Sequence, residues 1–160
     1  MAPVSGVEGG AGEKRLVRVF CDADVLIAGA ASTRGASHIL LQLSELTLID
    51  CVSSPAAIAE AERNIAAKLP AASSAFRKIL AAAVHGVPEP PPSTTNNLAG
   101  AAHPKDLPIL AAAVASRADF FATFNVRHYQ KRTEAPLVVQ PRRVVAAIRS
   151  LLARLSTEAM

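Results

Sequence analysis

Short apolar runs alternate with amphipathic segments along most of this chain. Four runs rich in β-branched or aromatic residues are too short for helices, and this predicts buried strands. Between them apolar residues recur at three- and four-residue intervals, as on one face of a helix. The predicted strands are residues 16–20, 47–52, 119–124 and 137–140, and the predicted helices are residues 36–46, 55–68, 72–84, 106–117 and 141–155.

Serine and proline positions indicate where several of these elements begin and end. Ser54 followed by Pro55 is typical of a helix start, and Pro70 ends that helix. Residues 87–95 contain four prolines in five positions, which predicts an extended connector with at most a short edge strand, and residues 96–104 a loop. A short helix is predicted at 125–130. Strands that alternate with helices indicate an α/β fold with a mostly parallel sheet.

Length and composition suit one domain, predicted at residues 15–156 after a small-residue lead-in at 1–14 that we expect to be flexible. Apolar residues make up 51% of the 160 positions and aromatics only 4%, so the core must be mainly aliphatic. No apolar run approaches the ~20 residues that span a bilayer. The first residues lack the features of a secretory signal, so we expect a cytoplasmic protein without membrane contact. Cys21 and Cys51 are expected to be buried thiols.

The net charge of +4 is compatible with a polyanionic partner. Arginines recur in the last predicted helix, and a basic group follows the third predicted strand. A solvated face that aids solubility would give the same pattern, so both interpretations stay open. The candidate nucleic-acid-binding residues of this group are Arg127, His128, Lys131 and Arg132.

Two carboxylates follow the first predicted strand directly. Asp22 stands at its tip, and Asp24 is expected on the same side because strand side chains alternate with period two. Carboxylates this close repel one another unless a cation or a proton lies between them. In open α/β sheets ligands bind outside the carboxyl ends of the strands, so this is a candidate site. Asp24 has a simpler alternative role, as a cap of the following turn.

Two further acids occupy comparable places. Glu60 lies in the second turn of the helix that starts at Pro55, whereas Glu62 lies roughly 200° around the axis and is expected at the surface. Asp106 precedes an Ala-rich helix, where a pure capping role is the alternative. Asp119 begins a strand, at the wrong end of the sheet, and is expected to be structural.

Two polar residues follow the third predicted strand on the same side of the sheet. Thr123 has a hydroxyl that can donate to a carboxylate or a phosphate, and Asn125 has a neutral oxygen or an amide for a metal-bound water. Oxygen ligands from separate elements favour a hard cation such as Mg²⁺ or Mn²⁺. The sequence therefore predicts a metal site on Asp22, Glu60 and Asp106, with Asp24 as a further ligand.

Four segments in this order resemble the PIN-domain nuclease family, which includes toxins of many bacterial toxin–antitoxin pairs. Each segment ends or begins a predicted strand or helix, and together they extend over nearly the whole chain. The segments are FCDADVLI at 20–27, SPAAIAE at 54–60, KDLPILAAA at 105–113, and ADFFATFN at 118–125 with RHY at 127–129.

The resemblance implies a three-layer α/β/α sandwich with a central, mostly parallel sheet, and cleavage of single-stranded RNA with Mg²⁺ or Mn²⁺. Asp22, Glu60 and Asp106 match the first three metal-site acids of the family, and Asp24 matches a position where many members have Asn, Ser or Asp. Asn125 stands at the fourth acidic position, which should weaken binding of a second metal ion. Asn125 and Thr123 would orient water or phosphate.

In toxin-type relatives an antitoxin blocks the active site and the nuclease forms a homodimer. The resemblance therefore implies an antitoxin protein and a second copy of the chain as partners, beside single-stranded RNA. The apolar faces of residues 39–46 and 79–84 are candidate surfaces for them. Of the aromatic residues only Phe124 and Tyr129 lie near the predicted site, so base stacking should be limited.

Other interpretations stay open. Haloacid-dehalogenase-type phosphatases also place two aspartates at the spacing of Asp22 and Asp24, and Ser53 or Ser54 could supply their second-strand hydroxyl. That mechanism also needs a late acidic pair, which the tail after Asp119 lacks. A PIN-like scaffold that binds RNA or protein without catalysis, and an α/β domain whose acids only cap helices or lie on the surface, are the remaining alternatives.

Overall fold

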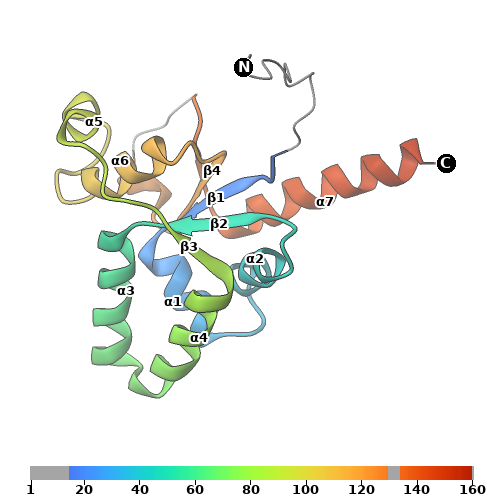
Figure 1. Cartoon of the computed structure of the whole chain (residues 1–160), viewed down its shortest axis with the longest axis horizontal. Helices are drawn as coiled ribbons and strands as arrows, with labels where there is room; N and C mark the ends of the chain where they lie inside the picture. Colours follow the sequence, from blue (N-terminus) through green and yellow to red (C-terminus); the bar gives the residue numbers. More distant parts are fainter. Residues whose placement is uncertain (1–14, 130–133, 160) are drawn as a thin grey trace, which may run out of the picture.

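The computed structural model describes residues 15–129 and 134–159, and in this part of the chain a parallel sheet of five strands forms the centre of the molecule (Figure 1). The strand order is β3-β2-β1-β4-β5, and every neighbouring pair is parallel. The strands are β1 (Arg18–Cys21), β2 (Asp50–Ser53), β3 (Val84–Gly86), β4 (Phe120–Ala122) and β5 (Leu137–Val139).

Helices cover both faces of this sheet, which confirms the predicted three-layer α/β/α sandwich (Figure 1). Helices α1 (Ala23–Ala31), α2 (Ala36–Glu45), α4 (Ser73–Ala83) and α7 (Pro141–Glu158) pack on one face. On the other face lies α6 (Leu107–Ala115), against which α5 (Pro92–Asn97) packs. Helix α3 (Pro55–Lys68) contributes buried residues to both cores.

The period-two alternation of the strands divides the buried side chains between two cores. In β1, Val19 and Cys21 join the core with α1, α2, α4 and α7, whereas Phe20 joins the core with α6. The ring of Phe20 stacks on that of Phe121 at a centroid distance of 5.4 Å. Three buried aromatic residues, Phe20, Phe121 and Tyr129, thus lie on the α6 side, whereas the other core is mainly aliphatic with Phe76 as its buried aromatic residue.

Helix α1 is the main element that the hydrophobic pattern does not predict. Its residues Val25, Leu26 and Ile27 are typical of a strand, and Gly29 has low helix propensity. The helix forms because Asp22 caps its N-terminus and its buried residues pack against α2 and α3. Asp24 therefore lies in the first turn of a helix, and the expectation that it follows strand alternation was wrong.

Two smaller differences concern the proline-rich connector. The segment predicted to be extended contains the helix α5, in which Pro92 occupies the first turn where proline is tolerated. The edge strand β3 lies before the prolines, directly after α4, and pairs with β2. Proline does not interrupt this strand because the chain reaches Pro88 only after its last residue, Gly86.

The apolar faces that were candidate partner surfaces belong largely to the core. Ile39, Leu40 and Leu43 of α2 and Ile79 and Leu80 of α4 pack into it, so these faces are not free for a partner. Exposed leucines lie instead on the distal half of α7, which projects from the body in Figure 1. None of the helices in residues 15–129 and 134–159 has the length and apolar character to cross a membrane.

Candidate functional site

An acidic pocket lies where the order of the strands reverses. From β1 the chain first adds β2 and β3 on one side, and then crosses to add β4 and β5 on the other. Ligands of open α/β sheets bind at such a reversal, outside the carboxyl ends of the strands. The pocket has a volume of about 130 Å³ and is lined by Asp22, Ala23, Asp24, Glu60, Lys105, Asp106, Asn125, His128 and Tyr129.

Asp22 is the most buried acid of this pocket, with 7% of its surface exposed. One carboxylate oxygen accepts from the amide of Ala23 at 2.8 Å. The other accepts from the hydroxyl of Thr123 at 2.8 Å and from that of Tyr129 at 3.3 Å. Burial raises the pKa of Asp22, and the charge of Asp106 adds to this, although the three hydrogen bonds act against it.

Asp24 approaches Asp22 from the first turn of α1. One of its oxygens accepts from the amide of Phe124 at 3.0 Å and from the side-chain amide of Asn125 at 3.1 Å. Its other oxygen, Oδ1, is buried and has no hydrogen-bond partner among the described residues. Burial, and then the charge of Asp22, raise the pKa of Asp24 from 3.8 to about 6. A carboxylate held in this state favours either a proton or a cation beside it.

Thr123 and Asn125 tie the loop after β4 to these two aspartates. Thr123 is completely buried, lies 2.8 Å from Asp22 and 3.4 Å from Asp24, and accepts from the amide of Asn125. Of the two roles predicted for Thr123, the geometry supports donation to a carboxylate, because a buried hydroxyl does not reach a phosphate. Asn125 lines the pocket and donates to Asp24.

Glu60 and Asp106 enter the pocket from opposite elements. Glu60 is largely exposed on α3, but the partial burial of its carboxyl group, and then the charges of Asp22 and Asp106, raise its pKa. Asp106 occupies the N-cap position of α6 but makes no capping hydrogen bond, and its buried Oδ2 has no partner in the described part of the chain. Capping therefore does not account for Asp106, and the structure places both acids where the sequence predicted them.

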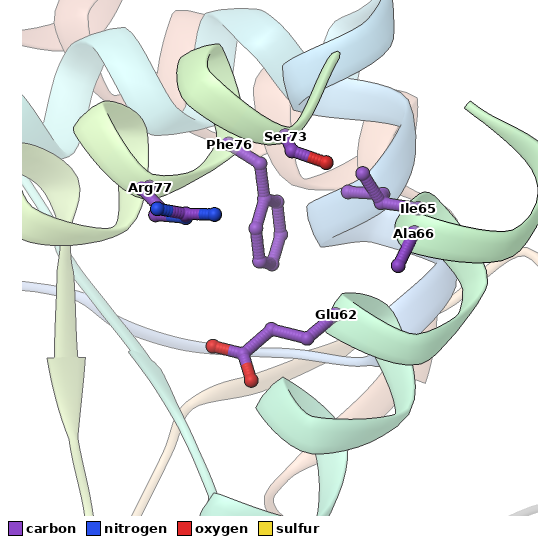
Figure 2. Close-up of a pocket in the computed structure, with 6 residues that line it drawn as sticks. All are labelled: Glu62, Ile65, Ala66, Ser73, Phe76 and Arg77. Atoms are coloured by element: carbon purple, nitrogen blue, oxygen red, sulfur yellow. The ribbon is translucent and has the colours of Figure 1, made fainter. Parts of the chain in front are cut away.

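Glu62 faces a different hollow, as its helical spacing from Glu60 predicted. A groove of about 260 Å³ lies between α3 and α4. Figure 2 shows Glu62 on one side of it, opposite Phe76 and Arg77. This groove is larger than the acidic pocket. Glu62 is its one carboxylate, and among the residues that line it no group of acids gathers. Pocket size alone therefore does not identify the site at which the acids gather.

Two polar residues of the pocket, Tyr129 and Lys105, were not predicted as site residues from the sequence. Tyr129 is 5% exposed, and its ring packs edge-on against Phe121 at 4.6 Å. The sequence had left Tyr129 as a candidate for base stacking. Because the side chain is buried and donates to Asp22, it is not available for that role. Lys105 brings a positive charge to the pocket and is the one lysine along its lining. Its position directly before Asp106 was a usable signal.

Of the four basic residues predicted to contact nucleic acid, the structure describes two. His128 lines the acidic pocket, and Arg127 is exposed beside it in the short 3₁₀ helix η2 (Val126–His128). Lys131 and Arg132 lie outside the described residues. Asp119 lies at the opposite end of β4, where it pairs with Arg15 and accepts from the backbone of Arg18, both at 2.8 Å, in agreement with its predicted structural role.

The donor chemistry of the pocket fits a hard divalent cation. Four carboxylates line it, two of their buried oxygens have no partner among the described residues, and the pKa values of three are raised. The acids are not drawn together, however: in residues 15–129 and 134–159 no three acid, histidine or cysteine side chains converge closely enough to enclose an ion. Ligation of an ion by three of these side chains would require them to approach one another more closely.

The structure argues against the phosphatase alternative, because neither serine suggested for its second-strand hydroxyl is available. Ser53 is completely buried and donates to the carbonyl of Cys21 at 2.8 Å. Ser54 is also completely buried and caps α3 by accepting from the amide of Ala57. Neither hydroxyl belongs to the lining of the acidic pocket.

Comparisons with known proteins concern the fold and the family of this chain. The fold is similar to that in a crystal structure of VapBC2 from Rickettsia felis bound to a DNA fragment from their promoter; 77% of this chain and 98% of that chain align, with a TM-score of 0.58 and 13% identity. The comparison with curated proteins finds no match. The sequence of residues 18–127 matches the PIN domain, more than half of the chain. The chain therefore belongs to the PIN-domain family, whose members are in general nucleases.

Proposed function

We propose that this chain is an endoribonuclease that depends on Mg²⁺ or Mn²⁺ and cleaves single-stranded RNA. One observation carries the proposal: Asp22, Asp24, Glu60 and Asp106 line a single pocket at the reversal point of a parallel sheet. Acids with a purely structural role are usually far apart or paired with cations. In this pocket, by contrast, burial and repulsion between the carboxylates raise the pKa values of three of the four acids. Such a cluster is favourable only with positive charge in it.

The proposed ligands of the ion are Asp22, Glu60 and Asp106, with Asp24 as a further ligand. A bound divalent ion would lower the pKa of a water and polarise a phosphate. The hydroxyls of Thr123 and Tyr129 hold the Asp22 carboxylate in one orientation. Asn125 does the same for Asp24, so both acids are fixed before substrate arrives.

Basic side chains beside the pocket suit a phosphodiester substrate. Lys105 and His128 line it, and Arg127 is exposed next to His128. A lysine or arginine here offsets the repulsion between the carboxylates and an approaching polyanion. We extend the proposal to the predicted cations Lys131 and Arg132, which follow in sequence. A narrow pocket of about 130 Å³ favours a single strand over a duplex.

We further propose that the chain is the toxin of a toxin–antitoxin pair, held inactive by an antitoxin protein and active as a homodimer. The similarity in fold to the VapBC2 complex supports this. The exposed Leu151, Leu152 and Leu155 of α7 offer apolar surface for a protein partner. Size-exclusion chromatography with light scattering would contradict the dimer if the purified chain were monomeric at micromolar concentration.

Cleavage of labelled single-stranded RNA tests the proposed activity directly. We expect products with Mn²⁺ or Mg²⁺, none with EDTA, and none from Asp22→Asn. Glu45→Gln is the matched control, since it removes the same charge from an exposed position at the end of α2. Cleavage that persists in Asp22→Asn or in EDTA would rule out the proposed site.

A non-catalytic PIN-like scaffold is the alternative, and two observations favour it. Asn125 contributes no charge at the fourth acidic position, and no three potential ligands converge in the described part of the chain. For this alternative we expect RNA binding without cleavage by the wild type, across several RNAs and both metal ions. Measurable cleavage that is lost in Asp22→Asn would exclude it.

A further inference from the structure

A second pocket lies on the other side of the η2 turn from the acidic pocket. It has a volume of about 340 Å³ and is lined by Val126, Val138, Val139, Gln140, Arg142 and Arg143. Residues of this turn line both pockets: Val126 lines this one, whereas Asn125 and His128 line the acidic one. The strand β5 and the start of α7 supply its remaining walls.

Two arginines give this pocket its charge. Arg142 and Arg143 are both exposed. The ion pairs of the described residues are Arg15–Asp119, Arg18–Asp50 and His85–Asp50, so neither arginine is paired with an acid of residues 15–129 or 134–159. Within the described part of the chain, no acid therefore competes with an external anion for either guanidinium group.

Helix stability does not explain these arginines. They lie in the first turn of α7, where the helix dipole favours acids and disfavours cations, and that turn contains no acid. Two adjacent cations also repel one another. Residues that oppose the local preference of a helix, such as cations in its first turn, are often found at binding sites. Here both arginines line a pocket.

We propose that this second pocket binds a backbone phosphate of the RNA strand whose neighbouring linkage lies in the acidic pocket. The inference rests on the proposed function and adds a substrate subsite to it. Arginine binds phosphate through two parallel hydrogen bonds, a geometry that lysine does not offer. The strand would cross the turn at Arg127 and His128, and the aliphatic wall of Val126, Val138 and Val139 would contact a ribose or a base face.

Salt-dependent RNA binding without catalysis tests this subsite. A short fluorescein-labelled single-stranded RNA is titrated with the protein in EDTA at several salt concentrations, and fluorescence polarisation gives the dissociation constant. In the double variant Arg142→Gln/Arg143→Gln we expect weaker binding. The slope of log K against log salt should fall by about 0.7 if one phosphate contact is lost, and by about twice that if both arginines contribute one each.

The control is Arg149→Gln/Arg154→Gln, which removes the same charge from exposed positions farther along α7. It should leave the slope close to that of the wild type. Equal slopes for the two double variants, or no RNA binding by the wild type, would overturn the subsite. So would an unchanged RNA slope together with loss of binding to a polyglutamate peptide, which would assign the arginines to an acidic protein partner.

Binding in EDTA also separates this inference from the proposed function. A wild type that cleaves RNA, with no effect of the Arg142 and Arg143 substitutions on the slope, would retain the nuclease and remove the subsite. A wild type that never cleaves, but whose slope depends on these arginines, would retain the subsite on a scaffold without catalysis.

Discussion

Replacing Asp24 by Asn should stabilise the folded chain at mildly alkaline pH. The folded structure raises the pKa of this carboxylate from 3.8 to about 6, through burial and the charge of Asp22. A difference of this size corresponds to at most about 3 kcal/mol of destabilisation by the charged form. Solvent screening at a half-buried carboxylate reduces it to about 1–2 kcal/mol. The Asn side chain still presents an oxygen to the amide of Phe124.

The pH dependence identifies the cause. Between pH 3.8 and about 6 the folded chain holds the Asp24 proton more tightly than the unfolded chain does, so wild-type stability falls as pH rises through this window. The Asn variant lacks this loss. We expect its melting temperature to exceed that of the wild type by about 2–8 °C at mildly alkaline pH, and the difference to shrink as the pH falls from about 6 to 3.8 and to be absent below 3.8.

Thermal unfolding in EDTA, followed by circular dichroism across this pH range, is the assay. An identical pH dependence in wild type and variant would refute the reasoning, because the destabilisation would then not come from ionised Asp24. Addition of Mg²⁺ or Mn²⁺ provides an independent readout. A bound ion at one hundred times its dissociation constant stabilises by about 2.7 kcal/mol. The wild type should gain more than the Asn variant, and no gain in the wild type would contradict the metal site.

Three further predictions concern the residues around the two aspartates. Tyr129→Phe removes a donor to Asp22, so the pH profile of RNA cleavage should move to more alkaline pH; an unchanged profile would contradict a positioning role. Thr123→Val removes the shorter donor to the same carboxylate, and urea titration should show a loss of about 1–3 kcal/mol in the free energy of unfolding. Asn125→Asp replaces a donor to Asp24 by a like charge, which should lower the melting temperature at mildly alkaline but not at acidic pH. Equal loss at both pH values would indicate a steric cause instead.

Local sequence determines much of this fold. The alternation of apolar runs with amphipathic segments predicted β1, β2, β4 and β5 to within a few residues. This is possible because the spacing of apolar residues differs between strands and helices. Ser54 and Pro55 placed the start of α3 correctly for a similar reason: capping depends on neighbouring residues. Where a segment is apolar on every side, as in α1, it has no period to detect, and packing against α2 and α3 decides the helix.

The candidate acids were likewise visible in the sequence, since carboxylates that follow apolar runs are rarely accidental. A shared site for them was also expected, but their place around one pocket depends on the strand order that brings β1 beside β4, which local sequence does not specify. That pairing places Asp22 against Thr123, although the two lie 101 residues apart in the chain.

Tertiary structure alone assigned Tyr129 to the pocket and showed that Asp106 makes no cap. It also placed Arg142 and Arg143 beside a hollow next to the acids. The sequence thus determined which residue types were available and which elements would hold them. Only the packed sheet decided which of them meet, because contacts between distant segments follow from how the strands are ordered and not from local propensity.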